Sequence, residues 1–330
     1  MLAAVTVLSA LSMVSAKTWH LEQGGQWKPP SEYLLTVARA KKLVNTAQCA
    51  AAEKALQQLK KDFPETVAPD PNALSAFNAF IDAEILFCKG KFTKALRSYD
   101  KFLAKYYHES ELYEVALDRQ FSIGMAFLSG RKKAVLRIFK IKGYAEGAEI
   151  MKSITNRVGL DTPIGIKAAK AVAESYEKRG KFIDAYEEWA ELSSKWETSQ
   201  IGKDALLGMA RCKHAAYKGP KYDASDLTGA KSYYEEFRLQ YPQYAQEIDV
   251  DKKLSQINEQ LAYKQFTIGR YYQKTWGKQK DAGGIDPANL YYQMIIDDDT
   301  WQGTTAAKMA DKMMRDKQSP RNLRGKKVKK

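Results

Sequence analysis

The side chains that could do chemistry in this chain are few and scattered. Cys212-Lys213-His214 holds two possible metal ligands, but no second pair follows at the spacing of a zinc site. Cys49 and Cys88 stand alone, so the three cysteines predict neither a disulfide framework nor a metal site. We expect them to be small, buried residues on helices.

The remaining candidates for chemistry also lack partners. His20 and His108 have no serine, cysteine or aspartate in a nucleophile motif. Asp297-Asp298-Asp299 lacks the ligand spacing of a calcium loop, which favours a solvated acidic turn. Gly90-Lys91-Phe92-Thr93 resembles the end of a phosphate-binding loop but lacks its upstream glycine. The sequence therefore predicts no catalytic residue, no cofactor and no bound metal.

A repeated helical pattern dominates the chain instead. Two segments align without a gap and begin at Gly90-Lys91-Phe92 and Gly180-Lys181-Phe182. Each continues with an alanine, an aromatic residue four positions later and an apolar residue three further on, which is one face of a helix. The copies are Ala95, Tyr99 and Phe102; Ala185, Trp189 and Leu192; Ala52, Leu56 and Leu59; Ala230, Tyr234 and Phe237; Ala288, Tyr292 and Ile295; and a degraded copy at Gly130, Val135 and Phe139.

This frame is typical of the second half of a tetratricopeptide repeat, in which the alanine lets paired helices approach and the aromatic fills the gap to the next pair. Asp70-Pro71, Thr162-Pro163 and Asp286-Pro287 each place a capping residue before a proline at the first helical position. No run of alternating β-branched residues predicts a strand. We expect an all-α fold of five or six helical hairpins in a right-handed solenoid over residues 31–315.

Both ends differ from this body. Residues 1–16 are apolar and end in Val14-Ser15-Ala16, which predicts an export signal, although a charged start is missing and a buried first helix is the other interpretation. A linker over residues 17–30 would follow. Residues 316–330 form a basic tail that is too poor in apolar residues to pack. Seven basic residues and no acidic residue lie between Lys317 and Lys330, among them Arg321, Arg324, Lys326, Lys327, Lys329 and Lys330.

The composition excludes several classes of protein. The 330 residues are 45% hydrophobic and 28% charged, which indicates a globular chain rather than wholesale disorder. Much of the net charge of +14 lies in the tail, so the sequence does not predict a basic face that follows nucleic acid. The tail is either a solubilising end or a weak attachment to an anionic membrane surface.

The order of the repeats resembles the BamD family, also called YfiO or ComL. The most specific stretch is YKGPKYDASDLTGAKSYYEEFRLQYP from Tyr217 to Pro242, and GRYYQKTWGKQKDAGGIDPANLYYQMIIDDD is similar to the last repeat of that family. Two features depart from its pattern. A lipobox cysteine is absent, because Lys17 follows the small residues, and Asp297 to Thr300 replace a Tyr-Pro terminator.

The resemblance implies a non-enzymatic scaffold of the outer-membrane β-barrel assembly machinery. It would work in the periplasm at the inner face of the outer membrane, and bind unfolded barrel precursors and the assembly subunit through a concave repeat surface. A generic periplasmic repeat adaptor in envelope division or polysaccharide export is the alternative, and an enzyme on a helical scaffold would need a cleft that the sequence does not offer. The expected concave wall carries Phe77, Phe80, Glu84, Lys167, Lys170 and Glu174.

Overall fold

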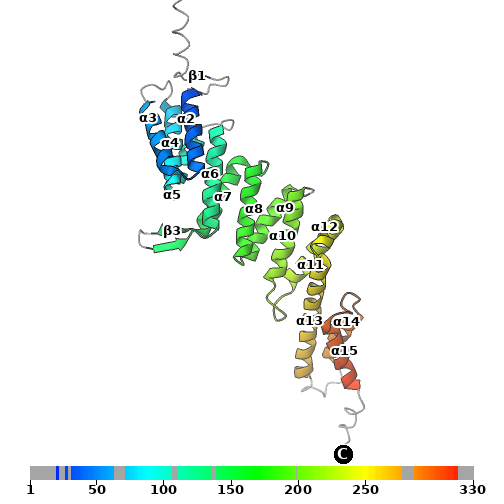
Figure 1. Ribbon diagram of the computed structural model, residues 1–330. Helices are drawn as coiled ribbons and strands as arrows, with labels where there is room; N and C mark the ends of the chain where they lie inside the picture. Colours follow the sequence, from blue (N-terminus) through cyan, green and yellow to red (C-terminus); the bar gives the residue numbers. More distant parts are fainter. Residues whose placement is uncertain are drawn as a thin grey trace, which may run out of the picture. The chain divides into compact units, whose positions relative to one another are not determined.

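A computed structural model describes most of the chain (Figure 1). The described residues are 20–21, 27–28, 31–62, 71–105, 111–135, 139–197, 199–276 and 286–318. The expected export signal over residues 1–16 and the six basic tail residues from Arg321 to Lys330 lie outside them.

Helices form almost all of the described structure, and they pair in sequence order as helical hairpins. The chain divides into two compact units, Met1–Ala168 and Ala169–Lys330. The first unit contains β1 (His20–Leu21), β2 (Trp27–Lys28), α2 (Ser31–Asn45), α3 (Cys49–Asp62), α4 (Pro71–Cys88), α5 (Phe92–Leu103), α6 (Glu111–Leu128), β3 (Lys132–Val135), β4 (Phe139–Lys142) and α7 (Tyr144–Val158). The boundary falls inside α8 (Pro163–Lys178), and the second unit continues with α9 (Phe182–Lys195), α10 (Gln200–Ala216), α11 (Ser225–Gln240), α12 (Pro242–Glu247), α13 (Val250–Trp276), α14 (Pro287–Asp297) and α15 (Thr305–Gln318).

The repeat frame read from the sequence is the hydrophobic core of these hairpins. In all five regular copies the alanine, the residue four positions later and the apolar residue at +7 are at most 3% exposed. Trp189, Tyr99 and Tyr292 are among the largest fully buried side chains. The fold is therefore an all-α array of tetratricopeptide-like hairpins, as predicted.

The turns inside the repeats follow the predicted pattern as well. Gly90 and Gly180 adopt φ of 68° and 72°, a left-handed conformation that glycine reaches without steric cost. Phe92, which starts the next helix, stacks on Phe87 of the preceding helix with ring centroids 5.4 Å apart. The turn thus fixes both the direction and the packing of the helix that follows.

Proline marks three helix starts where the sequence places them. The helices α4, α8 and α14 begin at Pro71, Pro163 and Pro287. At the last of these, Asp286 accepts a hydrogen bond from the backbone N–H of Ala288 at 3.0 Å. The carboxylate satisfies a backbone donor that has no partner within the helix.

The degraded copy expected at Gly130, Val135 and Phe139 is wrong, as is the expectation that the chain has no strand. Strands β3 and β4 form an antiparallel hairpin there, with Val135 opposite Phe139. The helix that completes this repeat is α7, whose frame lies twelve residues further along the chain than expected. Its frame residues are Gly147, Met151 and Ile154, all of them buried.

Glycine at the first position of this missed copy has a structural reason. A methyl group on Gly147 would lie 2.8 Å from the backbone nitrogen of Leu128 on α6. Because backbone cannot move aside as a flexible side chain can, α6 and α7 pack more closely than an alanine allows. Met151 replaces the aromatic residue of the regular copies and is fully buried.

The expectation for the cysteines is wrong for two of the three. Cys49, at the start of α3, and Cys88, at the end of α4, form a disulfide with their Cα atoms 5.4 Å apart. Cys212 is free and buried on α10, as expected. Its burial raises the pKa of its thiol to about 12, so it is an unreactive apolar residue.

Two of the predicted boundaries also shift. A short antiparallel pair, β1 with β2, lies inside the stretch expected to be a linker over residues 17–30. At the other end, α15 continues to Gln318, beyond the expected end of the repeats at residue 315. Within the described part of the chain, no helix is both long and apolar enough to cross a bilayer.

Candidate functional site

A groove in the first unit runs between α6 and the beginning of α8. These are the first helices of two successive hairpins, which form the concave wall in tetratricopeptide arrays. Its volume is about 690 Å³, which suits a few side chains of a bound segment. The lining residues are Tyr113, Glu114, Leu117, Asp118, Arg157, Val158, Thr162, Pro163 and Ile164.

The local sequence explains why α8 starts where it closes this groove. The hydroxyl of Thr162 accepts a hydrogen bond from the backbone N–H of Gly165 at 3.2 Å and caps the helix. A methyl group on Gly165 would lie 2.0 Å from the carbonyl oxygen of Gly159. Glycine therefore allows the first turn of α8 to sit directly on the end of α7.

The groove combines an apolar floor with charges of both signs. Glu114 and Asp118 are exposed and lie one turn apart on α6. Arg157 lies among the lining residues on α7, with its Nη2 3.5 Å from Oδ1 of Asp100. Its Nε is buried and has no hydrogen-bond partner among the described residues. This leaves an arginine donor without a partner at the wall, while burial raises the pKa of Tyr113 and keeps its hydroxyl protonated.

Glu84, predicted to face a partner, is instead a buried structural residue with 2% exposure. Its carboxylate accepts a hydrogen bond from Tyr99 Oη at 2.6 Å and two from Arg119, at 2.9 Å and 3.2 Å. Phe80 is 1% exposed and packs against Phe102 with ring centroids 5.2 Å apart. Both predictions are wrong because this face of α4 packs on α5 rather than on solvent. The side chain of Phe77 lies outside the described part of the structure.

The network around Glu84 connects three helices: α4, α5 and α6. Burial lowers the pKa of Arg119, but its hydrogen bonds to Glu84 and the negative charge of that carboxylate outweigh this effect and raise the pKa overall. Burial, followed by the charge of Glu84, raises the pKa of Tyr99 well above its usual value. Both side chains therefore hold their protons and act as fixed donors to the carboxylate.

The second unit contains the same arrangement on α8, α9 and α10, two hairpins further along the chain. Glu177 of α8 accepts two hydrogen bonds from Arg211 of α10, at 2.7 Å and 3.0 Å. The Nε1 of Trp189, which occupies the frame position of Tyr99, donates to Glu177 at 3.3 Å. The repeated glutamate–arginine–aromatic set joins successive hairpins and explains why these polar residues are not available to a ligand.

The other three predicted residues lie along α8. Lys167 is exposed, and Glu174 is half-buried. Lys170 forms an ion pair with Asp204 of α10, with 2.6 Å between Nζ and Oδ2. Lys167 is therefore the predicted lysine whose side chain is exposed to solvent. None of the three residues is among the nine that line the groove.

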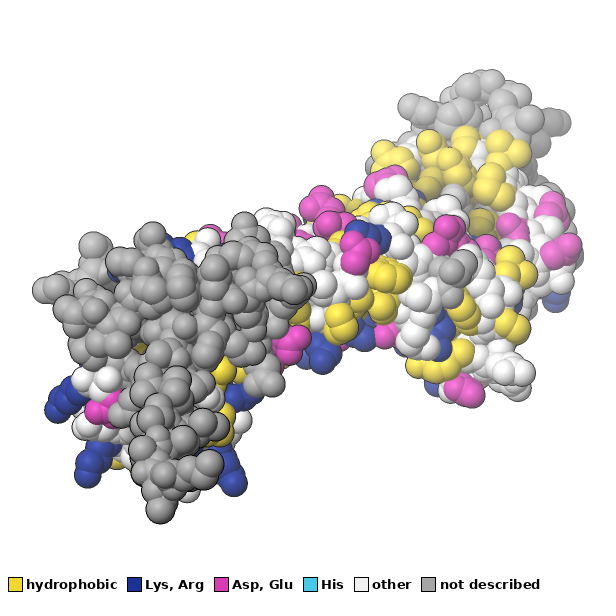
Figure 2. Space-filling view, turned by 90° about the horizontal axis from the view of Figure 1, so that it is seen from above, with side chains coloured by type: hydrophobic (Ala, Val, Ile, Leu, Met, Phe, Trp, Pro, Cys, Tyr) yellow, Lys and Arg dark blue, Asp and Glu magenta, His cyan; other side chains and the backbone are white. Residues whose placement is uncertain are grey.

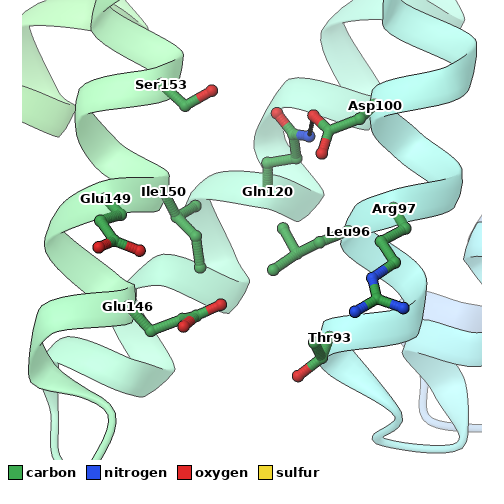
Figure 3. A pocket seen from close by; sticks show the side chains of 9 residues that line it. All are labelled: Thr93, Leu96, Arg97, Asp100, Gln120, Glu146, Glu149, Ile150 and Ser153. Atoms are coloured by element: carbon green, nitrogen blue, oxygen red, sulfur yellow. Dashed lines mark hydrogen bonds between the residues drawn. The ribbon is translucent and has the colours of Figure 1, made fainter.

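A second groove of about 260 Å³ lies on the opposite set of helices, between α5 and α7 (Figure 3). In this view Glu146 extends from α7 toward α5, which carries Thr93 and Arg97, while Glu149 lies along α7. Asp100 accepts a hydrogen bond from the buried amide of Gln120 at 2.9 Å. This hydrogen bond holds Asp100 in place at the edge of the groove.

The other candidates for chemistry are also accounted for by local structure. Nε2 of His214 lies 3.1 Å from Oε1 of Gln260, while Cys212 points into the core. Asp298 accepts hydrogen bonds from the backbone N–H and the hydroxyl of Thr300 at 2.8 Å and 2.6 Å, which is an acidic turn as predicted. No cluster of three or more metal-ligating side chains occurs in the described ranges. His20 lies in β1, and His108 lies outside the described residues.

The surface of the second unit carries its own apolar patch. Tyr271 of α13 and Leu290 and Met294 of α14 are 62%, 55% and 50% exposed. Hydrophobic side chains gather toward the C-terminal end of this unit in Figure 2. Tyr272 and Tyr291 stack beside them with centroids 5.6 Å apart. Exposed apolar residues are normal on protein surfaces, and this cluster by itself identifies no binding site.

Comparison with known proteins adds little to these observations. No protein-family model matches the chain, and no curated protein matches it either. One solved structure that aligns with it is the C-terminal part of a TPR repeat-containing protein from Cytophaga hutchinsonii. The two are 16% identical, the TM-score is 0.39, and the alignment covers 84% of this chain and 87% of the other. The assignment of the fold rests on the helix pairing and the buried repeat frame described above.

Proposed function

We propose that this protein is a non-enzymatic adaptor that binds an extended or helical segment of a partner protein in the groove between α6 and α8. The observation that carries the proposal is the lining of that groove. It joins apolar side chains from two successive hairpins with exposed carboxylates and an arginine. Such a surface binds a peptide through apolar anchors and fixes its direction through charge.

The charges specify the kind of segment that would fit. Glu114 and Asp118 favour a basic residue on one side of the bound chain, and Arg157, which also lines the groove, places a positive charge on the other. Tyr113, Leu117 and Ile164 provide an apolar surface between them. An amphipathic segment with an aromatic or aliphatic anchor beside a lysine or arginine meets all three requirements.

The narrower proposal is a scaffold of outer-membrane β-barrel assembly, which binds unfolded barrel precursors and the assembly subunit. It is supported by the resemblance of residues 217–242 to the BamD family, and by a buried repeat frame that matches that pattern. The Cys49–Cys88 disulfide supports a compartment outside the cytoplasm, because disulfides persist in oxidising environments. We propose that the protein works in the periplasm, at the inner face of the outer membrane.

The experiment that tests the proposal is site-specific photo-cross-linking in envelope fractions. A photoreactive benzoyl-phenylalanine replaces Glu114 in the groove, and the matched control replaces Glu187, which is exposed on α9. We expect position 114 to cross-link the barrel-assembly subunit or a barrel precursor, and position 187 to give little product. Cross-linking of a different envelope protein from position 114 would retain the adaptor and contradict the barrel-assembly role.

A further inference from the structure

The β3–β4 hairpin is an addition to the helical repeat that the groove does not use. It leaves the end of α6, returns to the start of α7, and stands away from the neighbouring helices (Figure 1). A helical repeat needs only a short turn at this place, as at Gly90 and Gly180. The extra residues therefore call for a separate role.

Two acid-free segments of the chain meet at the base of this hairpin. Residues 85–99 contain four basic and no acidic residues, and residues 119–145 contain seven basic and none acidic. A pocket of about 370 Å³ at their junction is lined by Lys91, Lys94, Arg131 and Lys132, together with Phe92. Within the described structure these three lysines are exposed and form no ion pair with a carboxylate.

Arginine 131 is held in place at this junction. Its guanidinium lies 3.9 Å above the ring of Phe92, and its Nη2 donates to the carbonyl of Gly90 at 3.3 Å. Stacking on an aromatic ring leaves the charge in place while fixing the side chain. The hairpin base is therefore an ordered cationic surface rather than a set of independent long side chains.

The strand register divides the hairpin into two different faces. Lys132 is opposite Lys142, and Ala134 is opposite Lys140, so these four positions share one face. The other face takes Val135 opposite Phe139, and Lys133 opposite Ile141. Ile141 is 50% exposed. By register, the positions of the first face are mostly lysine and those of the second are mostly apolar, and Lys132, Ile141 and Lys142 are exposed.

We propose that the β3–β4 hairpin and its base are a docking surface for a membrane rich in anionic phospholipid. The lysines and Arg131 bind headgroup phosphates, and the apolar positions of the hairpin enter the boundary between headgroups and acyl chains. A lipid surface offers phosphates to the cations and an apolar layer to Ile141, whereas a nucleic acid or another polyanion engages the cations alone. This inference is independent of the groove between α6 and α8.

The test is co-sedimentation of the full-length protein with vesicles of equal parts phosphatidylglycerol and phosphatidylcholine. The variant Lys132→Gln/Lys142→Gln removes two exposed charges from the basic face. Each basic residue near an anionic surface raises the partition coefficient about fivefold, so the double variant should bind roughly 30-fold more weakly. The matched control is Lys252→Gln/Lys308→Gln, two exposed lysines of the second unit, which should bind like the wild type.

Two further variants distinguish vesicle binding by the hairpin from vesicle binding by other parts of the chain. A chain lacking residues 319–330 should show the same ratio between wild-type and hairpin variants, because the basic tail contributes separately. Ile141→Ser should weaken vesicle binding about three- to tenfold and leave binding to heparin unchanged, since burial of apolar area contributes only in lipid. The proposal is overturned if the hairpin pair behaves like the control pair. It is also overturned if Ile141→Ser leaves vesicle binding intact, which would assign the surface to a soluble polyanion.

Discussion

A single methyl group added to α10 tests whether the helices cross where the structure places them. A methyl on Gly208 would lie 2.5 Å from Cδ2 and 2.6 Å from Cε2 of Trp189. Ordinary carbon contacts are about 3.5–4.0 Å, so the indole would have to retreat by about 1 Å. Trp189 is 1% exposed and donates its N–H to Glu177, so it has no free space to enter.

The magnitude follows from two opposing effects of Gly208→Ala. Overpacking of a rigid core costs about 3 kcal/mol at the upper end of its usual range. Alanine in place of glycine inside a helix recovers about 1 kcal/mol. We expect a net loss of about 2 kcal/mol in the free energy of unfolding, measured by urea denaturation followed by far-ultraviolet circular dichroism.

The same substitution elsewhere in this unit provides the control. A methyl on Gly229 of α11 would meet nothing closer than Cδ of Lys213 at 3.9 Å, an ordinary contact with a flexible side chain. Gly229→Ala should therefore stabilise the protein by about 1 kcal/mol. In a Trp189→Leu background, Gly208→Ala should no longer destabilise, because the ring that it meets is gone. If Gly208→Ala is as stable as the wild type, the packing of α9 on α10 described above is incorrect.

Two further predictions concern the disulfide and a buried histidine. Closing a loop of 39 residues stabilises a chain by about 4 kcal/mol in the chain-entropy model, so the free energy of unfolding of Cys49→Ser/Cys88→Ser should fall by about that much. A thiol titration of the denatured protein should find one thiol before reduction and three after it. Three thiols before reduction would contradict the disulfide. Burial lowers the pKa of His214 below its usual 6.5, so the folded state stays neutral while the unfolded state binds a proton. The free energy of unfolding should therefore fall as the pH drops below about 6.5, and this fall should be smaller in His214→Gln. An equal fall in the wild type and the variant would show that His214 is not the group responsible.

The sequence was informative wherever a pattern of neighbouring residues determines the structure. The small–large–apolar frame identifies helix faces because a hairpin buries one stripe of each helix, and all regular copies are buried. The copy at Gly147, Met151 and Ile154 was missed because glycine and methionine replace the usual residues and a β-hairpin displaces it. Alternation was visible at Phe139-Lys140-Ile141-Lys142, and it is the period of a strand.

The features that sequence reasoning missed depend on contacts between distant segments. Cys49 and Cys88 become neighbours only when α3 packs against α4, and their spacing alone does not reveal it. From the sequence, the helix face that carries Glu84 could line the concave surface or be buried. The ion pair of Glu84 with Arg119 of α6 shows that it is buried. The groove itself combines α6 with the start of α8, so the sequence shows Thr162-Pro163 as a helix start but does not show that it faces α6.

The central claim is that the groove between α6 and α8 binds a partner protein, and the yield of photo-cross-linking from position 114 relative to position 187 tests it most directly. Both positions replace an exposed glutamate on a helix, so their difference reports the place on the molecule rather than the chemistry of the probe. We expect a discrete cross-linked partner from position 114 that is absent or much weaker from position 187. Equal labelling from both positions, or none from position 114, would contradict it.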